Sequence, residues 1–307
     1  MPPESIDFDM WADVSKKIDD SKDLDELIDI FKFFFTHSTQ PSRIYHYTSP
    51  DGFLGIIKDD FNFRFTRADC LNDLLEGKQF LEVYETVCNE MVSENADFKQ
   101  PNEEFFSKIK MPNEFLVDTD HGLDFVNIDT YIGSFSLEPD CLPMWNYYLN
   151  NNRYEGYCLG ICTDSLPLHS LQIIYDDEKK KNMIRSVIKK ICEFANHEGN
   201  LTKFLGFMRN FLFNCCYIFK PSYFKHEREI RLIYHNNSIS KTPIDFRIKN
   251  GMLMPFIKVK INKNNLTSVK IAPLVKEEIA KHTTLELLKN YDYENVEVTN
   301  SIIDIRY

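Results

Sequence analysis

The sequence predicts an α+β fold in which short strands are scattered between helices. Several segments alternate apolar and polar residues, as strands do, while longer segments repeat their apolar residues every three or four positions, as helices do. The two kinds of segment do not follow the regular strand–helix–strand order of a doubly wound parallel sheet. The chain contains no Gly-x-Gly-x-x-Gly and no Gly-Lys-Ser/Thr loop. Any nucleotide must therefore be held without a Rossmann or P-loop cradle.

The composition excludes several classes of protein. The chain has 307 residues, of which 43% are hydrophobic and 14% aromatic, so a sizeable packed core is expected rather than global disorder. The net charge is −11. An extended nucleic-acid surface is not expected, because such a surface depends on cationic residues that neutralise phosphates. A small basic patch or an anionic cofactor remains compatible with this charge.

The termini and the cysteines indicate a cytoplasmic protein. The N-terminus is acidic and lacks the apolar core of a secretory signal. No apolar run approaches the ~18 residues that a membrane span needs, so no membrane partner is expected. The eight cysteines are then reduced and mostly buried. Cys158 and Cys162 are not followed by a second Cys/His pair at zinc spacing, and no metal site is expected.

The chain is predicted to consist of an N-terminal helical cap, residues 1–40, and a single α+β domain, residues 41–307. In the first half, we expect strands at 43–48, 61–65 and 131–136, and helices at 53–59, 74–94 and 141–150. The polar, irregular residues 95–128 are interpreted as a lid or an insertion. In the second half, we expect strands at 156–162, 171–175, 227–234, 256–261, 269–272 and 296–299, and helices at 177–196, 200–218 and about 275–290.

The strand 43–48 carries His46, whose side chain shares a face with Ile44 and Thr48, while Tyr45 and Tyr47 point the other way. Taken alone, such a histidine is more often a core residue bonded to a backbone carbonyl. The glycine-bearing turn, short helix and second strand that follow it make a compact frame, which can fix an imidazole beside a ligand. We expect His46 to line a polar cleft.

Three further segments have both a structural and a functional interpretation. Asn72-Asp73 precedes a helix and can cap it, or orient a ligand ribose at the rim of a cleft. Ser134 and Ser136 face one side of a strand, either by ordinary alternation or to line the His46 pocket. Trp145 is expected in the core, and Tyr148 is the better residue to stack on a flat ring.

The segment Lys225–Arg231 carries the sharpest local signal. A strand here projects Glu227, Glu229 and Arg231 from one face and apolar residues from the other. That face is either solvated, with an intrastrand Glu–Arg pair, or it lines a cleft, with a carboxylate held by a guanidinium. We expect Glu229 to point into the His46 pocket. Arg231 would pair with it or grip a cofactor phosphate.

These motifs together resemble a bacterial family catalogued as domain of unknown function 2971. The resemblance covers residues 43–307 and leaves the N-terminal helix outside. Each motif is weak alone, but they follow the family's order. They are His46-Tyr47-Thr48, Gly52, Ile56, Asn72-Asp73, Ser134-Phe135-Ser136, Met144-Trp145, Tyr148, Gly156, Lys225, Glu227-x-Glu229-x-Arg231 and Ser301-x-x-x-x-Arg306.

The opening of this region is also similar to certain ADP-ribosyltransferase-like toxins that act on nucleic acid or protein. That resemblance implies split mixed or antiparallel sheets with surrounding helices, and NAD bound between the sheets as a substrate. His46 would contact the ribose, Tyr148 would stack on nicotinamide, and Glu229 or Glu227 would be the catalytic carboxylate. The remaining cofactor contacts would be Tyr47, Thr48, Asn72, Ser134, Ser136 and Arg231. The Glu-x-Glu spacing resembles that of arginine-modifying enzymes, although here the pair is expected inside a strand rather than before one.

The resemblance therefore implies an enzyme: an NAD-dependent ADP-ribosyltransferase that modifies an unidentified protein or nucleic acid, as a bacterial toxin or defence effector. Two alternatives stay open. The same cleft can serve a non-catalytic module that senses a nucleotide, or Glu227 and Glu229 can serve a hydrolase or nuclease. A metal nuclease is expected to cluster more Asp, Glu and His than the single Glu-x-Glu seen here.

Overall fold

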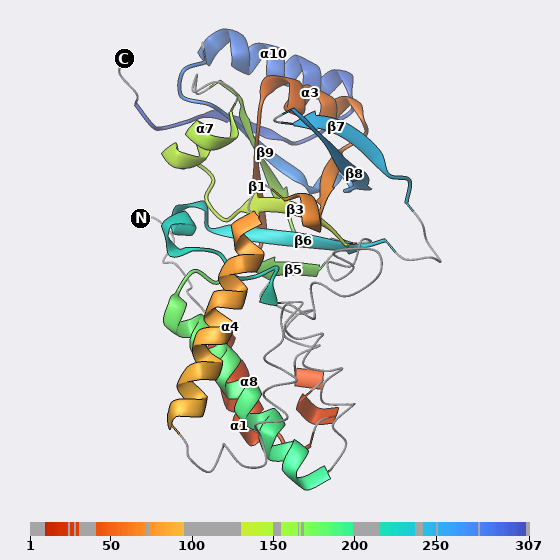
Figure 1. Cartoon of the computed structure of the whole chain (residues 1–307). Coiled ribbons are helices and arrows are strands. Elements are labelled where there is room, and N and C mark those ends of the chain that lie inside the picture. Colours follow the sequence, from red (N-terminus) through yellow and green to blue (C-terminus); the bar gives the residue numbers. More distant parts are fainter. Residues whose placement is uncertain are drawn as a thin grey trace. The chain divides into compact units, whose positions relative to one another are not determined.

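The chain has a mixed α+β fold with a mostly antiparallel open sheet and several helices (Figure 1). The computed structural model describes residues 10–23, 25–27, 29–30, 41–71, 74–94, 130–149, 155–164, 166, 169–198, 215–236, 242–249, 251–275 and 277–304. The chain divides into two compact units. The first contains Met1–Thr39, Asp73–Asn127 and Ile174–Ser222, and the second contains Gln40–Asn72, Ile128–Ile173 and Tyr223–Tyr307. The expected boundary near residue 40 coincides with a passage between units, but two later segments group with the N-terminal residues.

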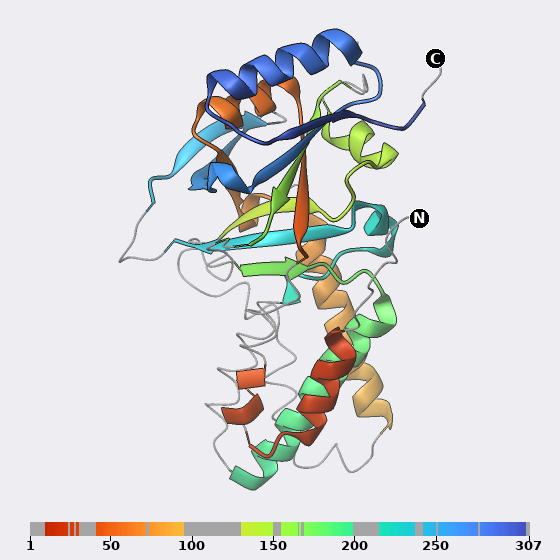
Figure 2. The ribbon, with the colours of Figure 1, turned by 180° about the vertical axis from the view of Figure 1, so that it is seen from behind.

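The first unit is helical. Its helix α8 (Asp177–Glu198) packs against both α1 (Met10–Asp20) and α4 (Leu74–Glu94), as Figure 2 shows for α1. The α4 and α8 helices match the expected ranges closely. Residues 200–214 of the helix expected at 200–218 lie outside the described residues. Apolar side chains at helical spacing fill the interior of this unit; they include Val14, Ile18, Phe80, Tyr84, Val87, Met183, Ile184, Val187 and Ile188.

The second unit contains the sheet. Its strands are β1 (Arg43–Thr48), β2 (Asn62–Arg67), β3 (Thr130–Ser136), β4 (Tyr157–Cys162), β5 (His169–Gln172), β6 (Glu229–His235), β7 (Asp245–Lys249), β8 (Met252–Lys260), β9 (Leu266–Ile271) and β10 (Glu297–Asn300). Its helices are α3 (Pro50–Lys58), α7 (Leu142–Tyr148) and α10 (Glu277–Asn290), with 3-10 turns η1 (Ala68–Cys70), η4 (Ser222–Glu227) and η5 (Lys263–Asn265). The strand β7 was not expected, and β8 begins at Met252 rather than Phe256.

The helix α3 begins three residues earlier than expected because its first turn is capped. The hydroxyl of Ser49 accepts a hydrogen bond from the backbone N–H of Gly52 at 3.2 Å, and Pro50 occupies the first turn, where its missing N–H is no loss. Position 52 favours glycine because the side chain of Thr48 approaches its backbone closely. A Cβ atom at this position would lie 2.1 Å from the hydroxyl oxygen of Thr48. The glycine thus lets the helix start directly against the end of β1.

The strand β3 is the branch point of the sheet. The strand order is β10-β9-β4-β1-β3-β2-β8-β7, and β6 pairs with both β3 and β5. One edge of β3 pairs with β6 along its whole length. On the other edge, Ser136 pairs with Tyr45 of β1, whereas Ile132 pairs with Thr66 of β2. The strands β1 and β2 therefore part from each other opposite Ser134.

The two faces of the sheet differ in chemistry. Residues directly opposite in paired strands lie on the same face. By this rule Phe135, Ile230 and Leu232 belong to one face, which joins a large buried cluster with residues of α3 and α10 (Figure 1). The other face carries the polar residues of β3 and β6. At its β1 end, a smaller cluster packs Tyr47 against Trp145 of α7.

Candidate functional site

The strand β6 opens with an ion pair between Glu229 and Arg231. Nε of Arg231 donates to Oε1 of Glu229 at 2.8 Å, and Nη2 donates to Oε2 at 3.2 Å. The two side chains are only 4% and 2% exposed. Two parallel hydrogen bonds from one guanidinium fix the carboxylate in both position and orientation. The expected intrastrand Glu–Arg pair is confirmed, but the face that carries it is buried rather than solvated.

Glu227 does not share a strand face with this pair, which corrects the expectation for residues 227–234. It ends the 3-10 turn η4, and Arg228 then adopts a left-handed backbone conformation, with φ of 41°, before the strand begins at Glu229. The carbonyl oxygen of Glu227 accepts a hydrogen bond from the hydroxyl of Ser136 at 2.7 Å. Glu227 is also buried. The Glu-x-Glu pair therefore straddles a turn and the first residue of a strand.

The two serines of β3 lie beside the Glu–Arg pair. Ser136 is directly opposite Glu229, and Ser134 is directly opposite Arg231, so all four side chains leave the same face of the sheet. Ser136 is fully buried, and its hydroxyl also accepts the backbone N–H of Glu138 at 3.0 Å. Ser134 is half-buried. A carboxylate, a guanidinium and two hydroxyls are thus brought together as a polar cluster, which we call the β3–β6 cluster.

His46 leaves the sheet on the opposite face. Its ring centroid lies 5.3 Å from that of Phe63 and 5.4 Å from that of Phe135, both members of the large apolar cluster. Because Tyr45 pairs with Ser136, the next residue of β1 must point away from the serine side chains. The expectation that His46 shares a pocket with the side chains of Ser134 and Ser136 is therefore wrong. Thr48, which is also buried, lies on the same face as His46.

The imidazole of His46 occupies the place where β1 and β2 part. Its Nδ1 lies 3.4 Å from the carbonyl oxygen of Ser134. Burial among aromatic rings lowers the pKa of His46 to about 4, against the opposing effect of the Ser134 carbonyl. The ring is therefore neutral at neutral pH. Its position favours the core interpretation, in which the histidine bonds a backbone carbonyl.

Tyr47 and the helix α7 support the β1 end of the polar face. The hydroxyl of Tyr47 donates to the carbonyl oxygen of Glu138 at 2.8 Å and accepts the N–H of Cys141 at 3.0 Å. Its ring meets that of Trp145 edge-on, with centroids 4.7 Å apart. Trp145 is fully buried, as expected for a supporting residue. Tyr148 is 40% exposed at the end of α7.

Asp140 is a connecting residue that the sequence motifs did not identify. Its Oδ1 accepts the indole N–H of Trp145 and the hydroxyl of Ser301, each at 2.7 Å, and its Oδ2 accepts the N–H of Ile302 at 2.9 Å. The ammonium group of Lys270 lies 3.5 Å from Oδ2. One buried carboxylate thus ties α7 to the segment after β10. This gives Ser301 a structural role.

Three residues of the expected motifs, Asn72, Asp73 and Arg306, lie outside the described residues.

Within the part of the chain that the structure describes, no group of three or more His, Cys, Asp or Glu side chains is placed to hold a metal ion. In that same part, no helix combines the length and apolar character needed to cross a bilayer.

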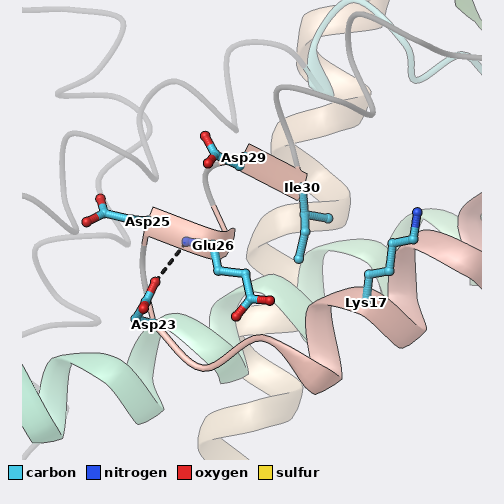
Figure 3. A pocket seen from close by; sticks show the side chains of 6 residues that line it. All are labelled: Lys17, Asp23, Asp25, Glu26, Asp29 and Ile30. Carbon is cyan, nitrogen blue, oxygen red and sulfur yellow. Dashed lines mark hydrogen bonds between the residues drawn. The ribbon is translucent and has the colours of Figure 1, made fainter.

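A hollow in the first unit is lined by acidic residues and stands apart from the expected site residues in sequence (Figure 3). Its lining is Lys17, Asp23, Asp25, Glu26, Asp29 and Ile30. The backbone N–H of Glu26 donates to Oδ1 of Asp23 at 2.8 Å, and the N–H of Lys22 donates to the Glu26 carboxylate at 2.9 Å. These bonds are those of a helix-start cap, so the acidic residues have a local structural role.

Comparison with known proteins identifies no relative of the chain. No family model matches it, and neither a curated protein nor a solved structure does. A functional assignment therefore has to come from the chemistry of the residues that the structure brings together.

Proposed function

We propose that the chain transfers the ADP-ribosyl group of NAD to a macromolecule, with Glu229 as the carboxylate that stabilises the transition state. The observation that carries the proposal is the buried, two-point Glu229–Arg231 pair beside two serine hydroxyls. In this reaction, the bond between the ribose C1′ and the nicotinamide nitrogen breaks, and its electron pair leaves with nicotinamide. A nucleophile of the target then bonds to C1′ and gives up its proton. Positive charge develops on the ribose between these two events.

A carboxylate stabilises that charge best when it is already ionised, fixed and dry. Arg231 supplies the second condition, because its fork fixes the Glu229 carboxylate through two hydrogen bonds. The low exposure of both residues supplies the third. An arrangement of this kind lowers the barrier by roughly 3–4 kcal/mol, which is about the effect of one well-placed polar group in an active site. Nicotinamide is a good leaving group, so the step needs no metal.

One feature of the fold supports the proposal. Glu227 lies in the turn before β6 and Glu229 is the first residue of the strand, so the pair departs less from the arginine-modifying arrangement than the sequence had suggested. The proposal does not rest on the expected split sheets, because the described strands form one ten-stranded sheet. In this proposal Ser134 offers a hydroxyl to the ribose, since the hydroxyl of Ser136 already bonds the protein backbone. His46 would act as a positioning residue, because its imidazole contacts the backbone carbonyl of Ser134 at the branch of the sheet.

A second candidate is a nucleotide-binding module without turnover. It is favoured by the fact that Arg231 engages both carboxylate oxygens of Glu229, which neutralises much of the charge that catalysis would use. A metal-dependent hydrolase or nuclease draws no support from the described residues, among which no group of three or more His, Cys, Asp or Glu side chains is placed to hold a metal ion.

Labelled NAD separates these candidates. The full chain is incubated with NAD that carries the label on the adenylate half, with and without cell lysate, and macromolecules and free nicotinamide are analysed. The transferase proposal predicts label on a macromolecule and an equal amount of nicotinamide. Saturable NAD binding with neither product would support the binding module. Absence of both binding and product would overturn the two candidates together.

A further inference from the structure

Three cationic residues gather on one face of the outer sheet strands. The register pairs Thr66 of β2 with Phe256 of β8, and Phe256 with Asp245 of β7, so these three share a face. By alternation, Arg64 of β2 projects from the same face. Arg247 and Lys249 of β7 project there as well. We call these three cations the β2–β7 cluster.

An aromatic ring, rather than a carboxylate, holds the two guanidinium groups. The Cζ of Arg64 lies 5.2 Å from the ring centroid of Phe256, and the Cζ of Arg247 lies 6.0 Å from it. Phe256 is almost fully buried, so it fixes its neighbours without being free to stack on a ligand. Nη2 of Arg247 also donates to the hydroxyl of Thr66 at 2.8 Å. The arginines are therefore held in place while close to each other.

The charges of this cluster repel one another. Burial, and then the charge of Arg64, lower the pKa of Arg247 below its usual range. Burial, and then the charge of Arg247, lower the pKa of Lys249 in the same way. The second of these causes means that each cation destabilises the charged form of the next. An anion bound between them would reverse the sign of this effect.

The described residues provide no anion for them. Neighbouring lysines are neutralised: the ammonium of Lys258 lies 2.6 Å from the Asp59 carboxylate, and Lys260 pairs with Asp60. No such carboxylate partner is found for the β2–β7 cluster within the described part of the chain. Asp245, on the same face of β7, accepts the backbone N–H of Phe246 through Oδ1 at 2.7 Å.

One donor of the cluster is also unused. Nε of Arg247 is buried, and among the described residues it has no hydrogen-bond acceptor. A buried donor without an acceptor is rare and unfavourable, and such a group commonly marks the place of a bound ion or ligand. The net charge of the chain is −11, so carboxylates outnumber cations. Three cations without a carboxylate partner among the described residues are therefore unusual and point to an anionic ligand.

We propose that Arg64, Arg247 and Lys249 form a binding site for a phosphate group. A phosphate carries several acceptor oxygens and bears the charge that the cluster lacks. The planar guanidinium fork of Arg247 would turn its buried, unused Nε toward one oxygen, Arg64 would face another, and Lys249 would contribute a point charge. The site does not depend on the transferase proposal. Its ligand is either a free phosphate or diphosphate, or the diphosphate of a nucleotide.

Calorimetric titration of the full chain tests this site. Phosphate, pyrophosphate, ADP and adenosine are each titrated at constant ionic strength, with sodium chloride as the blank. The site predicts saturable binding of phosphate or pyrophosphate and none of adenosine. Equal affinity for ADP and pyrophosphate would identify the diphosphate alone as the ligand. Tighter binding of ADP would identify a nucleotide.

Three variants and a matched control assign the binding to these residues. Lys249→Met, Arg64→Met and Arg247→Met should each weaken pyrophosphate binding at least tenfold. Lys258→Met should leave it unchanged, because Lys258 lies on the same face of the neighbouring strand but is paired with Asp59. Circular dichroism checks the fold, and the two remaining variants decide the outcome if Arg247→Met does not fold. No binding by the wild type, or equal weakening by Lys258→Met, would overturn the proposal whatever the outcome with NAD.

Discussion

Glu229 and Arg231 form a two-point ion pair that is almost completely removed from solvent, with Nε to Oε1 and Nη2 to Oε2 distances of 2.8 and 3.2 Å. Moving two charges out of water is costly, and only good geometry offsets the cost. The pair is therefore sensitive to the loss of one partner. The two residues proposed for the chemistry are therefore expected to contribute to the stability of the second unit as well.

A double-mutant cycle tests the pair directly. Glu229→Leu and Arg231→Met should each lower the free energy of unfolding by about 3–5 kcal/mol, because each removes one side of a buried two-point ion pair. The double variant should be more stable than either single variant, since it buries no lone charge. Urea denaturation of the four proteins gives the coupling energy. Strictly additive losses would contradict the pair as described.

The buried imidazole of His46 predicts that the stability of the fold depends on pH. His46 has its pKa lowered to about 4 in the folded chain, against about 6.5 when unfolded. The unfolded state therefore takes up the proton first, and the stability that neutral His46 contributes is lost as the pH falls from about 6.5 to about 4. The loss is at most about 3 kcal/mol.

His46→Phe supplies the comparison for that prediction, because it keeps a ring between Phe63 and Phe135 but cannot titrate. The difference in unfolding free energy between wild type and variant is measured by urea denaturation across this pH range. Carboxylates that titrate in both proteins cancel in the difference. As the pH falls, the wild type should lose more unfolding free energy than His46→Phe. Parallel curves of unfolding free energy against pH would show that the imidazole is not buried as described.

Asp140 is predicted to hold the segment after β10. Asp140→Ala removes the acceptor of Trp145, Ser301 and Ile302 and should cost about 1–3 kcal/mol, since the part-buried donors of Trp145 and Ser301 lose their acceptor. Limited proteolysis should then cut near residue 300 earlier than in the wild type. Glu138→Ala in the same loop is the matched control. It removes only a half-exposed ion pair with Arg228 and should cost less than about 1 kcal/mol.

Two glycines in the second unit should respond to alanine with opposite signs. A Cβ at Gly133 of β3 would lie 2.4 Å from the ring of Phe65, so Gly133→Ala should destabilise the fold by about 1–3 kcal/mol. A Cβ at Gly55 of α3 would meet no atom within 4 Å. Gly55→Ala should therefore stabilise the fold by about 0.5–1 kcal/mol through helix propensity. Thermal unfolding of both variants checks the signs, and a gain at Gly133 would contradict the packing of β3 on β2.

Most secondary elements could be predicted because their apolar periodicity is strong. The alternation in β1 and β3 and the helical repeat in α4 and α8 matched the observed elements to within a few residues. The strand β7 was missed because Asp245-Phe-Arg-Ile-Lys249 is an edge strand whose two apolar residues stay exposed. It therefore lacks the buried face by which a strand is usually recognised.

The candidate site could be predicted only in part, because periodicity gives the neighbours on one strand but not the register between strands. The Glu229–Arg231 pair is local, and the sequence indicated it. The face of His46 depends on the pairing of Tyr45 with Ser136, which no pattern within β1 specifies. The position of Glu227 depends on the left-handed backbone at Arg228, which is uncommon for a residue other than glycine.

Release of nicotinamide by the wild type and by Glu229→Gln, measured alongside NAD affinity, tests the proposed function most directly. We predict release by the wild type and a fall of about 10²–10³-fold in the variant, with NAD affinity little changed, because the charge acts mainly in the transition state. Glu286→Gln on the exposed side of α10 is the control and should match the wild type. Rates are scaled to the folded fraction of each protein. No release by the wild type, or equal rates in wild type and Glu229→Gln, would contradict the role given to Glu229.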